Sequence, residues 1–311
     1  MNLDLHFSFR RFSYAIFAGC LLWSLLPTVA RGQTAEDTKQ KVESSLVKDS
    51  DSIAKMLEAL PERLPVKPGK HVRILLLTKG TFGMPGASAL VALLREADRR
   101  YDALEVTELF ADNDINGEML KNYDLVVLNA VGSTNRREVF NEILPAYVRE
   151  GGAIFATHSS LIKHAGGAES LFNHMMGAVV DDRHSHTGHP GKHWFPLPLV
   201  LPDPTHPAVR SVPAPVELGD EPYVFIEPPD QEHRPQVLIA IDKERVTKQE
   251  YPDYADALTY AIAWTKPYGK GRIYYTQWAH FMKTYTVPWV VRTMLDGLLF
   301  TAGALAEPEN Q

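Results

Sequence analysis

The chain has 311 residues, of which 45% are hydrophobic and 23% charged, a balance typical of a globular protein with a sizeable core. Its formal net charge of −6 argues against a nucleic-acid partner, which would require a basic face. The single cysteine, Cys20, lies in a segment that we expect to be removed, so the mature chain excludes disulfides, cysteine–zinc sites and a cysteine nucleophile.

Residues 1–30 have the features of an export signal. Arg10 and Arg11 precede an apolar run over residues 12–26, and small residues suited to signal-peptidase cleavage end at Ala30. The alternative is an uncleaved membrane anchor, but the run is at the short end of the roughly 17 to 25 apolar residues that span a bilayer. We therefore expect a periplasmic or secreted protein whose membrane contact is limited to this segment.

Residues 31–66 are predicted to form a helical appendage. Apolar residues recur every three to four positions between Val42 and Leu60, as in an amphipathic helix, and Pro61 and Pro65 end the pattern. The pattern is equally compatible with an appendage packed on the main domain and with a mobile tether.

Residues 70–304 are predicted to form one domain, followed by a tail over residues 305–311. Its first half alternates strands and helices; the strands are expected at 72–78, 104–110, 124–130 and 153–157, and the helices at 87–100, 116–122 and 135–150. The continuous aliphatic run over 72–78 is typical of a strand buried on both faces of a parallel sheet. This pattern predicts a flavodoxin-like, doubly wound, mostly parallel α/β sheet, which binds ligands beyond the carboxyl ends of its strands.

The second half of the domain differs in composition. Prolines and histidines are dense over residues 174–235, where segments 194–201 and 223–227 are predicted to be antiparallel edge strands or a small β-rich insertion. The remaining elements are expected to be strands at 236–241, 257–264 and 272–277 and a closing helix at 288–304.

Two histidines stand at the expected ligand-binding edge of the sheet. His158 directly follows the strand over 153–157, and His280 follows the strand over 272–277. An imidazole at the carboxyl end of a buried parallel strand faces the ligand crevice and can act as acid, base or metal ligand. One such histidine is more often a hydrogen-bonded structural residue, but the pair favours a functional pocket.

A second group of histidines lies in one loop, at His184, His186, His189 and His193. Their spacing permits shared metal coordination, although a histidine-rich loop can also be simply polar and exposed. We select His184 as the metal ligand because it lies closest to the preceding segment over 176–181.

Glu221 is the candidate carboxylate. It follows Asp220 and precedes Tyr223 at the expected start of a strand, where it could act as a general base or orient an imidazole. Its alternative role is a strand-end carboxylate that accepts hydrogen bonds from backbone amides.

Other motifs are missing from the sequence. It has no phosphate-binding P-loop, no dinucleotide fingerprint after the first strand and no G-x-S-x-G elbow, which disfavours nucleotide-dependent enzymes and serine hydrolases. Ser159 and Ser160 lie just past the position of such an elbow, and both are retained as candidate nucleophiles.

Five motifs occur in an order that matches a known family. They are GGAIFATHSS at 151–160, MG at 176–177, DPTHP at 203–207, DEPY at 220–223, and AW at 263–264 followed by GKGRIYYT at 269–276 and His280. Together they resemble the ThuA-like (trehalose-utilisation) family over about residues 72–304. The resemblance implies a fold similar to that of class I glutamine amidotransferases.

The same resemblance implies a set of pocket residues. His158 stands where amidotransferases hold their catalytic cysteine, and without a thiol their glutamine hydrolysis is chemically implausible. Carried over by motif, the pocket consists of His158, Glu221 and His280. His184 matches the family's loop histidine, with His186 as the alternative because this loop is unusually rich in histidine, and His206 matches as a structural turn.

Two functions are compatible with these observations. The first is an enzyme that acts on a carbohydrate or sugar derivative as a hydrolase, lyase or isomerase, with His158, Glu221 and His280 as catalytic residues. Its expected cofactor is a divalent metal such as zinc, held by His158, His184 and His280, and no nucleotide. The second is a non-catalytic sugar-binding or scaffold protein. Both imply a small-molecule carbohydrate partner and leave homo-oligomerisation open.

Overall fold

The computed structural model describes most of the chain after the predicted export signal. The described ranges are residues 34–79, 85–132, 136–161, 170–180, 195–228, 232–246 and 260–306. The predicted signal over residues 1–30 and the histidine-rich loop over 181–194 lie outside these ranges. Within the described part of the chain, no helix combines the length and apolar character needed to cross a membrane.

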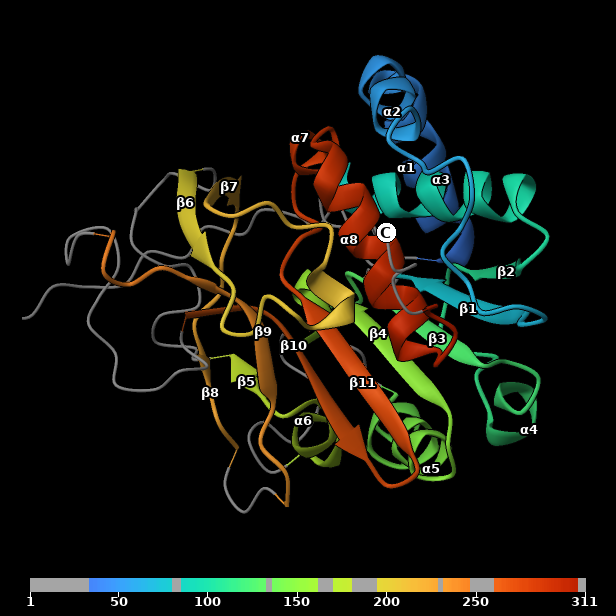
Figure 1. The fold of residues 1–311 in the computed structure, drawn as a ribbon. Helices are drawn as coiled ribbons and strands as arrows, with labels where there is room; N and C mark the ends of the chain where they lie inside the picture. The colour runs from blue at the N-terminus through green and yellow to red at the C-terminus, as the bar shows by residue number, and fades with distance from the viewer. Residues whose placement is uncertain are drawn as a thin grey trace, which may run out of the picture. The chain divides into compact units, whose positions relative to one another are not determined.

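A central sheet organises the domain (Figure 1). Among the described residues it has nine strands in the order β2-β1-β3-β4-β11-β10-β9-β6-β7. The first five are parallel neighbours: β2 (Leu104–Leu109), β1 (Val72–Thr78), β3 (Leu125–Asn129), β4 (Ala153–Thr157) and β11 (Gly271–Thr276). This parallel part has the flavodoxin-like order, so the predicted α/β class with a mostly parallel sheet is confirmed.

The rest of the sheet is antiparallel. It consists of β10 (Ala261–Tyr268), β9 (Gln236–Ile241), β6 (Phe195–Val200) and β7 (Val216–Asp220). Segments 194–201 and 223–227 were predicted to be edge strands or a small insertion, and each outcome occurs once. The first becomes β6 in the main sheet, whereas the second contributes β8 (Phe225–Ile226), which pairs with β5 (Val179–Val180) in a separate two-stranded sheet.

Strand β10 runs further than predicted. We expected this strand to end at Trp264. The structure continues it to Tyr268, with Lys266 buried and its ammonium group donating to the main-chain carbonyl of His174. Because the buried ammonium group of Lys266 has this hydrogen-bond partner, the strand can continue past Trp264.

Side chains alternate across β1 and enter two separate cores. Val72, Ile74 and Leu76 pack on the face covered by α3 (Pro85–Arg100) and α8 (Pro288–Thr301). Leu75 and Leu77 pack on the opposite face. That face is covered by α4 (Gly117–Leu120), the π-helical η1 (Val139–Ile143), α5 (Leu144–Arg149) and α6 (Leu171–Met176). Because strand side chains alternate, one aliphatic run supplies both cores.

The N-terminal segment forms two helices, α1 (Ala35–Lys48) and α2 (Ser50–Leu57), instead of one continuous helix. Thr34 starts α1 with a capping box, and Val42 and Met56 are fully buried. Arg95 of α3 forms an ion pair with Glu43 of α1 at 2.8 Å. The segment therefore packs on the domain.

Candidate functional site

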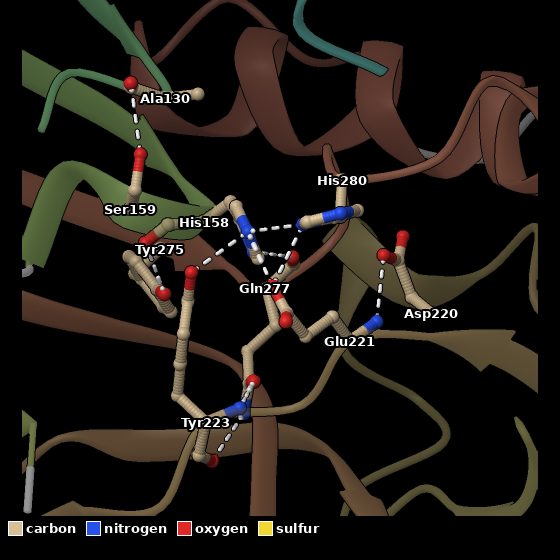
Figure 2. A network of polar contacts seen from close by, with 9 residues as sticks. All are labelled: Ala130, His158, Ser159, Asp220, Glu221, Tyr223, Tyr275, Gln277 and His280. Carbon is tan, nitrogen blue, oxygen red and sulfur yellow. Dashed lines mark hydrogen bonds and ion pairs between the residues drawn. The ribbon is translucent and has the colours of Figure 1, made fainter. Parts of the chain in front are cut away.

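His158 occupies a strained position at the carboxyl end of β4. Its φ is 45°, in the left-handed region that non-glycine residues seldom adopt, and it begins the 3₁₀ helix η2 (His158–Leu161). Its main-chain carbonyl accepts a 2.7 Å hydrogen bond from the Tyr275 hydroxyl (Figure 2). A residue held in such a conformation by its surroundings is a common feature of functional sites.

Ser159 and Ser160, which remained open as nucleophiles, have other roles. The Ser159 hydroxyl donates to the Ala130 carbonyl and the Ser160 hydroxyl to the Leu128 carbonyl, each at 2.8 Å. Both serines are buried, and Ser160 also accepts from the main-chain N–H of Val131. These bonds join the ends of β3 and β4, so the two serines fix the turn that presents His158.

The structure brings together the three predicted pocket residues, which follow β4, β7 and β11. His158 Nε2 lies 3.2 Å from His280 Nδ1 and 3.3 Å from Glu221 Oε2. Glu221 Oε2 lies 2.7 Å from His280 Nδ1. The side chains of His158 and Glu221 are 0% and 6% exposed, whereas that of His280 is 20% exposed and reaches solvent.

A main-chain carbonyl sets the tautomer of His158. Nδ1 lies 3.1 Å from the carbonyl oxygen of Gln277, and a ring nitrogen facing a carbonyl must carry the proton. Nε2 therefore presents its lone pair, and it lies 2.8 Å from the Tyr223 hydroxyl. The neutral ring consequently offers one acceptor, directed at the cluster.

In the cluster, the His158 ring is neutral and the Glu221 carboxylate is ionised. Burial lowers the pKa of His158, which keeps the ring neutral near pH 7. Burial alone would raise the pKa of Glu221, but its close contacts with the imidazoles of His158 and His280 outweigh burial and hold that pKa well below its usual range. Burial raises the pKa of the adjacent Asp220 to about 7. Glu221 is thus the ionised carboxylate at this site.

The three converging atoms could hold a metal ion. Tetrahedral zinc with bonds of about 2.0 to 2.2 Å separates its ligand atoms by about 3.3 to 3.6 Å. The two distances from His158 Nε2 approach this range, and the 2.7 Å contact between Glu221 and His280 is a hydrogen bond that a metal would replace. Two imidazoles with one carboxylate are a donor set used by both zinc and non-haem iron.

Gln277, a polar residue that was not predicted to belong to the pocket, supports the cluster. The Gln277 side chain accepts from the main-chain N–H of Tyr223 and donates to the Tyr223 carbonyl and to that of Ala261. It thereby attaches the segment carrying Glu221 and Tyr223 to the end of β11 (Figure 2). The sequence did offer a signal for Gln277, because this polar residue directly follows a buried strand.

The other predicted histidines lie partly outside the described residues. His184 and its alternative His186 lie outside the described residues, so the assignment of His184 as a ligand stays a prediction. His206 accepts from the main-chain N–H of Ala208 at 3.3 Å and packs against Phe300, as expected of a structural turn.

Strand order and site together define an α/β protein of the flavodoxin-like type with a His–Glu–His cluster at its strand ends. Within that class the chain belongs to the ThuA family, described as trehalose utilisation, whose model matches residues 73–301. The resemblance inferred from the five motifs is therefore confirmed. Among curated proteins, none matches the chain.

Solved structures show the same fold. A ThuA-like protein from Bacteroides uniformis ATCC 8492 superimposes with a TM-score of 0.59 at 12% identity, covering 76% of this chain and 93% of that chain. A ThuA-like protein from Parabacteroides merdae ATCC 43184 gives a TM-score of 0.54 at 19% identity, covering 77% and 93%. At these identities the likeness establishes the fold alone.

Proposed function

We propose that the chain is an exported enzyme that acts on a carbohydrate or sugar derivative with the help of one divalent metal ion. The observation that carries the proposal is the convergence of His158 Nε2, Glu221 Oε2 and His280 Nδ1 within 3.3 Å of one another. The description of the family supports the substrate class.

The donor set fits a metal because two of its three groups already have the required protonation state, and Nδ1 of His280 would give up to solvent the proton that it now donates to Glu221. His158 is neutral with its free lone pair turned inward, Glu221 is anionic, and His280 reaches solvent and leaves an approach open. A bound divalent ion would polarise a substrate oxygen as a Lewis acid. The chain's own residues would hold this ion and orient the substrate beside it.

The composition of the site narrows the reaction class. A glycosidase with two catalytic carboxylates needs a pair that acts from opposite sides of the scissile bond. Glu221 is tied to both imidazoles, and its neighbour Asp220 accepts from the Glu221 main-chain N–H at 2.8 Å, with a pKa of about 7. Metal-assisted hydrolysis, lyase or isomerase chemistry fits this site better than two-carboxylate glycoside hydrolysis.

Metal binding is the first test of the proposal. Mature protein loaded with Zn²⁺ and freed of excess metal should contain one equivalent by elemental analysis, and His158→Ala should lose it. His206→Ala is the matched control, because it removes a buried histidine remote from the cluster and should retain the metal. Wild-type protein without stoichiometric metal would remove the basis of the proposal.

Turnover is the second test. Incubation of the loaded protein with trehalose and a panel of other disaccharides and sugar acids, followed by NMR, distinguishes hydrolysis, elimination and isomerisation by product. Sugar binding with no product from wild-type protein would instead support the non-catalytic sugar-binding module.

Export has a separate test. Cell fractionation and N-terminal sequencing of the mature protein should find it outside the cytoplasm and beginning near residue 31. An intact N-terminus in the membrane fraction would favour the anchor.

A further inference from the structure

A cavity of about 160 Å³ lies where three segments of the chain meet. Residues 61–65, between α2 and β1, form one wall, the residues just after the 3₁₀ helix η4 (Pro207–Val209) form the second, and the middle of α8 forms the third. The cavity shares no lining residue with the His–Glu–His cluster. A cavity of about 150 Å³ accommodates a molecule of the size of benzene, so this one has room for a small ion or organic acid.

Three arginines line this cavity, and one of them is neutralised within the fold. Arg210 donates through Nη2 to Asp296 Oδ1 and through Nη1 to the Ala306 carbonyl, each at 3.0 Å. The other carboxylate oxygen of Asp296 accepts from the Ser211 hydroxyl at 2.6 Å. Asp296 is buried, and these two partners satisfy its charge.

The other two arginines leave the cavity positively charged. Arg63 and Arg292 are exposed, and neither has a hydrogen-bond or ion-pair partner among the described residues. With Arg210 and Asp296 counted, the lining has a surplus of two positive charges. Like charges around one cavity repel each other, and an anion bound between them would relieve that repulsion.

We propose that this cavity binds a small oxyanion with two negative charges: phosphate, either free or as the phosphate group of a small ester. The guanidinium group of arginine stays charged at neutral pH, and its paired N–H donors match the oxygens of phosphate. The charge of the anion equals the surplus on the lining. Residues 61–65 precede the region matched by the family model, so the site depends on the N-terminal segment of this chain.

Calorimetric titration of the metal-free mature protein with inorganic phosphate tests the proposal. At low ionic strength, where charges are least screened, wild type should bind one equivalent. Arg63→Ala and Arg292→Ala should each weaken binding about three- to tenfold, because each variant loses a charge-assisted contact. Both side chains are exposed, so these variants keep the buried Arg210–Asp296 pair that supports the fold.

Arg99→Ala is the matched control for these variants. It removes an exposed arginine that does not line the cavity, and it should bind phosphate as wild type does. Absence of phosphate binding by wild type would overturn the proposal. Unchanged binding by both Arg63→Ala and Arg292→Ala would overturn it as well.

Two further ligands define the anion. Glucose 6-phosphate that binds more tightly than phosphate would support a site for a phosphate ester, and weaker binding would support a site for free phosphate. Acetate has a single charge and should bind at least about tenfold more weakly than phosphate. Equal affinities for acetate and phosphate would contradict a site for a doubly charged anion.

A second measurement needs no variant. Saturating phosphate should slow the modification of Arg63 and Arg292 by phenylglyoxal, measured by mass spectrometry of peptides, and leave that of Arg99 unchanged. If phosphate protects neither cavity arginine, or protects Arg99 equally, the inference is wrong.

Discussion

The Nδ1 nitrogen of His158 faces the main-chain carbonyl oxygen of Gln277 at 3.1 Å. A backbone carbonyl can only accept, so this contact determines which ring nitrogen is protonated and turns the other toward Glu221 and His280. The carbonyl belongs to the end of β11 and the imidazole to the end of β4, which are neighbouring parallel strands. The pairing of two strands thus prepares the histidine as a base or metal ligand.

The side chain of Gln277 should be as important as its carbonyl. Gln277→Ala leaves buried main-chain groups of Tyr223 and Ala261 without partners, which should lower the free energy of unfolding by about 2 to 4 kcal/mol. Zn²⁺ affinity should also fall, because the segment carrying Glu221 is no longer attached to β11. Urea unfolding and calorimetry measure the two effects. Gln236→Ala, at an exposed position, is the control, and equal behaviour of both variants would contradict the prediction.

Glu221 supplies the negative charge of the cluster. Glu221→Gln keeps the size of the side chain but removes that charge, so Zn²⁺ affinity should fall about 100-fold or more in calorimetric titration. Glu217→Gln is the control, since Glu217 is an exposed residue of β7 that pairs with Arg245. A loss smaller than about threefold for Glu221→Gln would show that the carboxylate is not a ligand.

Gly86 should determine the position of His280. Its N–H donates to the His280 carbonyl at 3.1 Å, and a Cβ added at Gly86 would lie 2.3 Å from the Ala279 carbonyl oxygen. Gly86→Ala should therefore displace this backbone, lower the free energy of unfolding by about 1 to 3 kcal/mol and weaken Zn²⁺ binding.

Gly117→Ala is the matched control for this substitution. Gly117 also lies at the start of a helix, but a Cβ there meets nothing within 4 Å. This variant should be as stable as wild type or slightly more stable. Similar Zn²⁺ affinities for Gly86→Ala and wild type would exclude the positioning role.

Asp220 should make stability depend on pH. Burial raises its folded-state pKa from 3.8 to about 7, so between about pH 4 and pH 7 the unfolded carboxyl loses its proton while the folded one keeps it. This contribution is fully present below about pH 4 and falls as pH rises, with a total loss of at most about 4 kcal/mol above pH 7.

Asp220→Asn mimics the protonated side chain and removes this titration. The stability of the variant relative to wild type, measured by urea unfolding with chelator present, should rise from pH 4 to pH 7 and then level off. A difference that stays constant over this range would show that the pKa of Asp220 is not raised.

Much of the fold is determined locally and was predictable from the sequence. The strands over 72–78 and 153–157 have the predicted bounds, because a buried parallel strand needs a continuous aliphatic run with recognisable ends. The positions of His158 and His280 at strand ends were likewise visible, and strand ends in this fold lead to the ligand crevice. The extension of β10 past Trp264 was not predicted, because the hydrogen-bond partner of the buried Lys266 comes from a distant segment. The division of residues 35–57 into two helices was not predicted either.

Only the tertiary structure decided which strand ends meet. β11 pairs with β4 although more than a hundred residues separate them, and this pairing places His280 beside His158. Glu221 follows β7 at the far edge of the sheet, yet Gln277 holds its segment against β11. Such contacts depend on pairing between distant segments, which no local pattern of residues encodes. The sequence by itself therefore determined the elements, the family and the candidate side chains, and the folded chain determined their convergence, the tautomer of His158 and the place of Tyr223.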